Sequence, residues 1–100
     1  MELEEITLKI PRSVAQGLEK RDILFFLADK ALSKLEYYRS RVEIFRRKYG
    51  CELKEFQKRV LSHKEDFEKW EDLILWEGYE RAYREWKRKY EDLKSVLPDH

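Results

Sequence analysis

The chain has 100 residues, of which 42% are hydrophobic and 43% are charged, and its 22 basic and 21 acidic side chains leave a formal net charge of +1. This balance excludes a global field that would draw the chain to nucleic acid or to an anionic membrane. The many charges and the evenly spread aromatic residues exclude disorder and favour long helices.

The composition also indicates where the protein works. The sequence has no Asn and only two Gln, beside abundant Glu, Lys and Arg, which is typical of proteins that function at high temperature. The N-terminus is acidic and lacks a signal-type apolar core, and no run approaches the roughly 18 apolar residues that span a bilayer. We therefore expect a cytoplasmic protein of a thermophile that does not enter a membrane.

Residues 5–10 alternate between polar and apolar side chains, a period-two pattern that predicts a short strand. Ile6, Leu8 and Ile10 would share one face of that strand. A lone strand leaves its edges unpaired, so we expect it to pair with a second copy or with a partner chain. Pro11 and Ser13 then favour a short helix that weakens at Gly17, so residues 1–20 form a candidate dimerisation or DNA-binding element.

Residues 21–50 predict the first long helix. Asp22 suits its N-cap, and Gly50 suits a left-handed C-cap after three basic residues in the last turn. The apolar positions alternate in steps of four and three, which is coiled-coil spacing. They are Leu24, Ala28, Ala31, Leu35, Tyr38, Val42, Phe45 and Tyr49.

Residues 51–65 predict a short helix with Leu53, Phe56, Val60 and Leu61 on its apolar face. Residues 66–97 predict the second long helix, with Asp66 as its N-cap and Pro98 just beyond its end. Its seam has the same spacing. It comprises Leu73, Trp76, Tyr79, Tyr83, Trp86, Tyr90, Leu93 and Leu97.

Each long helix would extend roughly 40 Å at 1.5 Å per residue. Because the two lengths match, an antiparallel hairpin is the simplest arrangement. The expected fold is a mainly α single domain, residues 1–100, in which two long amphipathic helices and two short ones form a hairpin or bundle preceded by a short β-strand. The heptad spacing also permits pairing between chains, so we expect a homodimer.

Groups for catalysis are scarce, so we expect neither an enzyme nor a cofactor. His63 lies near Glu65 and Asp66 without the spacing of a metal-ligand pair, and His100 is the last residue. Cys51 has no second Cys or nearby His, which favours a partly buried structural thiol.

The second seam is rich in Trp and Tyr, which are enriched at interfaces and also fill cores. We expect different rings to serve the protein's own core and a partner protein. The candidate partner-binding residues are Trp70, Trp76, Tyr79, Tyr83, Trp86 and Tyr90.

Two stretches resemble small antitoxins of prokaryotic toxin–antitoxin modules. The predicted strand, Pro11 and the two following helices resemble the opening of ribbon-helix-helix antitoxins, and this resemblance makes Thr7 and Lys9 candidate DNA-contacting residues. Lys48-Tyr49-Gly50, Glu55-Phe56, Trp70-Glu71 and Trp76-Glu77 are similar to a pattern of such antitoxins. The resemblance implies a protein that binds and occludes a cognate toxin.

Three hypotheses follow from the sequence. The first is an antitoxin that binds and neutralises its toxin. The second is a DNA-binding autoregulator that uses a dimeric N-terminal ribbon, with a weaker contribution from the basic side chains of residues 21–50. The third is a structural helical oligomer without another ligand.

Overall fold

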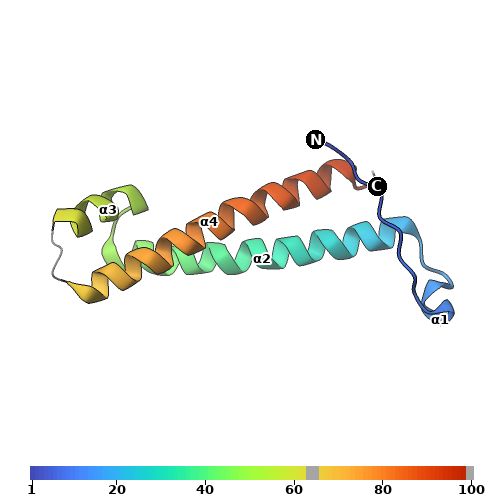
Figure 1. Cartoon of the computed structure of the whole chain (residues 1–100), viewed down its shortest axis with the longest axis horizontal. Coiled ribbons are helices and arrows are strands. Elements are labelled where there is room, and N and C mark those ends of the chain that lie inside the picture. The colour runs from blue at the N-terminus through green and yellow to red at the C-terminus, as the bar shows by residue number, and fades with distance from the viewer. Residues whose placement is uncertain (63–65, 99–100) are drawn as a thin grey trace.

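The computed structural model describes residues 1–62 and 66–98, which form four helices. These are α1 (Arg12–Ala15), α2 (Lys20–Tyr49), α3 (Leu53–Ser62) and α4 (Phe67–Val96). The two long helices lie side by side and antiparallel, and α3 lies at the end where the chain passes from one to the other (Figure 1). The prediction of a mainly α hairpin is confirmed, with helix ends within a few residues of the expected positions.

The predicted strand at residues 5–10 is wrong. Residues 1–11 adopt neither helix nor strand, and every side chain in this N-terminal segment is exposed. Alternating apolar residues make a strand only where a second strand accepts and donates the backbone hydrogen bonds. The described part of the chain contains no strand, so nothing in it offers that pairing.

The ends of α2 differ in how well they were anticipated. Its N-cap is Glu19, and Asp22 instead lies three residues inside the helix, where its carboxylate accepts a 2.9 Å hydrogen bond from the Glu19 backbone N–H. This contact belongs to a capping box, in which the side chain at the third helical position reaches back to the N-cap. At the other end Gly50 adopts the predicted left-handed conformation, with φ 63°.

The ends of the other helices follow local chemistry. The Asp66 carboxylate accepts from the Lys69 backbone N–H at 3.2 Å, so it caps α4 as predicted. Leu97 is extended, as expected for the residue before Pro98. The short helix α1 ends at Ala15, earlier than expected, because Gln16 is extended and Gly17 has a φ of 79°.

The two predicted seams face each other. On α2, the residues Ala28, Ala31, Leu35, Val42 and Phe45 are buried and the other three of the seam are half-buried. On α4 only Leu73 and Trp76 are buried, and the seam residues from Tyr79 to Leu97 are half-buried. Burial along α4 is therefore concentrated in its first three turns.

The hydrophobic core lies at the end of the hairpin that α3 covers, which we call the closed end. Its buried members are Phe45, Phe56, Val60, Leu73 and Trp76. The rings pack face to face, with centroids 5.7 Å apart for Phe45 and Trp76 and 4.1 Å apart for Tyr49 and Phe56. The opposite end, formed by the start of α2 and the end of α4, is called the open end.

Candidate partner-binding surface

The closed end is fixed by a polar cluster beside the core. The Lys48 ammonium lies 2.7 Å from the Asp72 carboxylate and 3.1 Å from that of Glu68. The Tyr49 hydroxyl donates a hydrogen bond to the same Asp72 oxygen. These contacts join the last turn of α2 to the first turns of α4, so this cluster stabilises the fold.

The pKa values in this cluster follow from its geometry. Desolvation and the hydrogen bond to the Asp72 carboxylate raise the pKa of Tyr49 to about 12. Burial raises the pKa of Asp72, but the hydrogen bonds from Lys48 and Tyr49 together outweigh it, and the net pKa is lowered. The pKa of Lys48 is raised, first by its hydrogen bond to Asp72. All three groups are thereby held in the charge states that favour the cluster.

The aromatic residues and Lys48 of the second antitoxin-like stretch meet at this closed end. Phe56 and Trp76 belong to the buried core, and Tyr49 and Trp70 pack against it. Lys48 pairs with α4 through Asp72 and Glu68. The similar pattern is therefore carried by side chains that hold the hairpin together.

The open end has two layers where the closed end has three, because α3 does not reach it. Tyr83, Trp86 and Tyr90 lie half-buried along this half of α4. The Lys89 ammonium lies 4.5 Å from the Trp86 ring centroid and that of Lys94 lies 5.1 Å from the Tyr90 centroid. These flexible cations cover ring faces that a partner could contact in their place.

The N-terminal segment carries the largest run of exposed apolar side chains, and it reaches the open end. Leu3, Ile6 and Leu8 are 76%, 77% and 64% exposed. Near its start the Ser95 hydroxyl of α4 donates to the Met1 sulfur at 3.6 Å. The N-terminus lies near the end of α4 (Figure 1). Contiguous exposed apolar side chains of this kind mark interaction sites.

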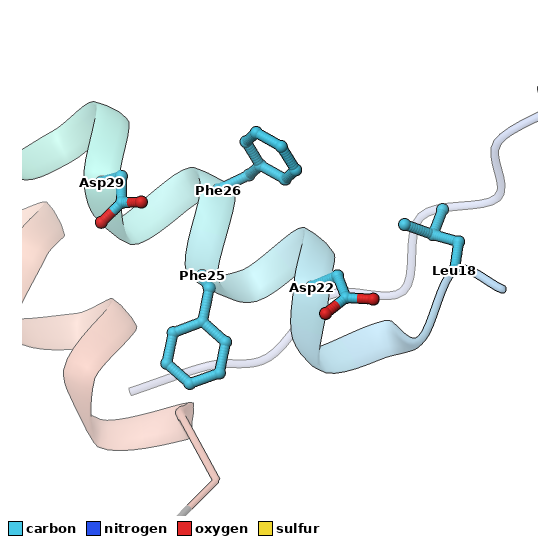
Figure 2. A pocket seen from close by; sticks show the side chains of 5 residues that line it. All are labelled: Leu18, Asp22, Phe25, Phe26 and Asp29. Atoms are coloured by element: carbon cyan, nitrogen blue, oxygen red, sulfur yellow. The ribbon is translucent and has the colours of Figure 1, made fainter. Parts of the chain in front are cut away.

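A hollow of about 290 Å³ lies where the chain enters α2. It is lined by Leu18, Asp22, Phe25, Phe26 and Asp29, and Figure 2 shows the two phenyl rings pointing away from the helix in different directions. Phe26 is 74% exposed. Apolar walls with two carboxylates suit a side chain that has an apolar stem and a positive head, such as Lys or Arg.

We group these features as the open-end surface. It consists of Leu3, Ile6, Leu8, Ile10, Leu18, Phe26, Trp86 and Tyr90. Sequence analysis identified the N-terminal apolar residues, although as a strand face, and it identified the two α4 rings. It missed Phe26, whose position outside the four-three spacing of the α2 seam was the available signal.

The six aromatic residues expected to bind a partner fall into two groups. Trp76 is fully buried, and Trp70 and Tyr79 pack against the same core. Tyr83, Trp86 and Tyr90 lie on the open half of α4. The structure thus places the first three with the core and leaves the second three accessible at one edge.

The remaining candidate residues are not members of the open-end surface, and those that the structure describes do not form a second site together. Thr7 and Lys9 are exposed on the N-terminal segment, which lacks the predicted strand. Cys51 is half-buried and packs against the core. His63 and His100 lie outside the described residues. Within residues 1–62 and 66–98, no group of three His, Cys, Asp or Glu side chains is arranged to hold a metal ion.

A second exposed apolar patch lies near the closed end. Phe67 is 84% exposed and Ile74 is 66% exposed, and both lie on one face of α4. Their helix spacing of seven residues places them two turns apart. This patch is smaller than the open-end surface.

None of the described helices combines the length and the apolar composition needed to cross a membrane. No protein-family model, curated protein or solved structure is significantly similar to the chain.

Proposed function

We propose that the chain is a non-catalytic interaction protein that binds a partner protein through its open-end surface. The observation that carries the proposal is the exposure of Leu3, Ile6 and Leu8 beside the half of the hairpin that has no third helix. Burying apolar side chains of this size yields about 1.5–3 kcal/mol each. A partner that covers the surface would therefore gain several such contributions.

The partner class we propose is a toxin of a toxin–antitoxin module. Support comes from the antitoxin-like pattern at Lys48-Tyr49-Gly50, Phe56, Trp70 and Trp76. Phe56 and Trp76 belong to the hairpin core, and Tyr49 and Trp70 pack against it. In this proposal the closed end gives rigidity and the open end binds the toxin. The apolar side chains of the N-terminal segment would be buried against the partner.

The test uses the product of the gene adjacent to the one that encodes this chain. Expression of that product alone should arrest growth, and co-expression of the chain should restore it and give a stoichiometric complex. A variant with Ile6→Glu and Leu8→Glu should lose both effects while keeping its helical circular dichroism, because only exposed side chains change.

The matched control is Glu2→Gln with Glu4→Gln, which alters the same segment without adding polar groups to apolar positions. It should restore growth like the unmodified chain. Full rescue by the Ile6 and Leu8 variant would refute the open-end surface as the binding site. A harmless neighbouring product that forms no complex would refute the antitoxin proposal itself.

A further inference from the structure

Outside the seam that packs against α4, α2 carries a second heptad stripe. Ile23, Lys30, Tyr37 and Ile44 are spaced seven residues apart. A second residue of the stripe follows each of them three positions later. This outer stripe consists of Ile23, Phe26, Lys30, Ser33, Tyr37, Ser40, Ile44 and Arg47. All eight side chains are exposed, including Phe26 at 74%, Ile44 at 49% and Tyr37 at 47%.

The residues that flank the outer stripe are sorted by charge. On one side of the stripe, each residue of the heptad series that starts at Ile23 is directly preceded by an acidic residue. This acidic flank consists of Asp22, Asp29, Glu36 and Glu43. The basic flank lies on the other side of the stripe and consists of Lys34, Arg41 and Lys48, with Leu27 at the fourth equivalent position. In heptad terms the acidic residues occupy g positions and the basic residues e positions.

Contacts with α4 already engage part of the basic flank, because the Lys48 ammonium pairs with Asp72 and Glu68. The Arg41 guanidinium lies over the Tyr79 ring of α4.

Contacts within one helix do not account for the rest of the sorting. Each acidic residue of the flank is five residues before its basic counterpart, as in Asp29 and Lys34, and side chains five apart do not face each other on a helix. Glu36 and Glu43 approach Arg39 and Arg46, three residues further on, at 3.9 and 2.8 Å. Asp29 and Lys34 form no ion pair with any described residue.

The sorting does fit two parallel copies of α2. In a parallel pair each g residue faces the e residue five positions later on the other chain, which brings Asp29 to Lys34 and Glu36 to Arg41. In an antiparallel pair e would face e and g would face g, so like charges would be opposed. The charges therefore select one orientation.

We propose that two copies of this chain associate in parallel through the outer stripe of α2. Ile23, Phe26, Tyr37 and Ile44 supply the apolar contacts. Asp29 with Lys34 and Glu36 with Arg41 supply the ion pairs on both edges, while Lys48 stays in the closed-end cluster. Lys30, Ser33, Ser40 and Arg47 also lie in the stripe, and polar residues at such positions fix register at a cost in affinity. The dimer is thus reversible, and Phe26 is the residue that its interface shares with the open-end surface.

The first test measures association of the chain by sedimentation equilibrium at low and high salt. We expect a monomer–dimer equilibrium that weakens as salt screens the flanking charges. A double variant Lys34→Glu with Arg41→Glu should weaken dimerisation by about tenfold or more, because both flanks become acidic. The variant Asp29→Lys with Glu36→Lys should be weakened similarly, and an equimolar mixture of the two variants should dimerise again.

A matched control reverses two charges on α4. Lys87→Glu with Arg88→Glu changes net charge by the same amount at exposed positions away from α2, so it should dimerise like the unmodified chain. A monomer at every concentration would overturn the proposal. So would a dimer that is insensitive to the α2 reversals, since its interface would then be another surface.

The second test fixes the orientation. In a Cys51→Ser background, Ser33→Cys and Ser40→Cys are made separately and oxidised. A parallel pair in register brings each of these positions against itself, within the short distance that a disulfide requires, so both variants should cross-link. Cross-linking at only one position, or at neither, would exclude the parallel arrangement. Asp29 lines the hollow of the open-end surface, but the substitutions at Lys34, Arg41, Ser33 and Ser40 lie outside that surface. With these variants this proposal and the proposed function can fail separately.

Discussion

Tyr49 donates a hydrogen bond to the carboxylate of Asp72 across the closed end of the hairpin. The same carboxylate oxygen lies 2.7 Å from the Lys48 ammonium. One acidic residue of α4 is thus bound by two consecutive residues at the end of α2, next to the stacked rings of the core. Four predictions follow from this closed end and from the glycines of the long helices.

Removing the hydroxyl of Tyr49 should lower the free energy of unfolding while the packing of its ring is kept. Tyr49→Phe deletes a hydrogen bond to a charged group, for which a cost of about 1.5–3 kcal/mol in the free energy of unfolding is typical. The ring stays stacked on Phe56. Urea unfolding followed by circular dichroism measures the change, and an unchanged midpoint would contradict the prediction.

The same variant should also change the alkaline behaviour. The folded pKa of Tyr49 is raised from 10.0 to about 12, so its stabilising effect is complete below pH 10 and is lost as the pH rises through the folded value. The unmodified chain should lose stability between about pH 10 and 12. Tyr49→Phe should lose less over that window, and an identical slope would show that Tyr49 is not the titrating group.

Asp72 should govern how the free energy of unfolding falls at acid pH. Because its folded pKa is lowered, its contribution is present above the unfolded value of about 3.9 and is lost as the pH falls through the folded value. Asp72→Asn should be less stable at pH 7 and show a flatter decline below pH 4. The control Asp92→Asn, at an exposed position near the end of α4, should retain the decline of the unmodified chain.

Two glycines should respond in opposite directions to substitution by Ala. Gly78 is exposed within α4, and a Cβ there would meet nothing within 4 Å, so Gly78→Ala should stabilise by about 1 kcal/mol. Gly50 has a φ of 63°, so Gly50→Ala should destabilise by about 1–2 kcal/mol. Thermal unfolding of both variants under one condition tests the contrast, and shifts of the same sign would refute it.

Sequence reasoning located the helices because their seams and end signals are local. The left-handed Gly50, the Asp66 cap and the stop before Pro98 each depend on one or two residues. The strand at residues 5–10 failed because a strand needs a partner, which no local pattern can guarantee. Asp22 failed as an N-cap because the capping box allows the acid to lie three residues inside the helix.

The candidate site was only partly predictable for a related reason. The Trp and Tyr residues of a seam have the same spacing along the chain whether their rings face a third helix or solvent, so spacing cannot tell the two cases apart. The position of α3 decides this, since it buries Trp76 and leaves Trp86 half-buried at the open end. Phe26 was missed because exposed apolar residues do not belong to the seam that defines the helix.

The large buried side chains of the core cluster lie at one end, and this gives the molecule a gradient of local stability along its 60 Å length. Fluctuations that separate α2 from α4 cost least where few apolar contacts must break, which is at the start of α2 and the end of α4. Backbone amides around Leu24 and Leu93 should therefore exchange hydrogen faster than those around Phe45 and Leu73. The closed end thus keeps the two long helices together, while their other ends can separate more easily.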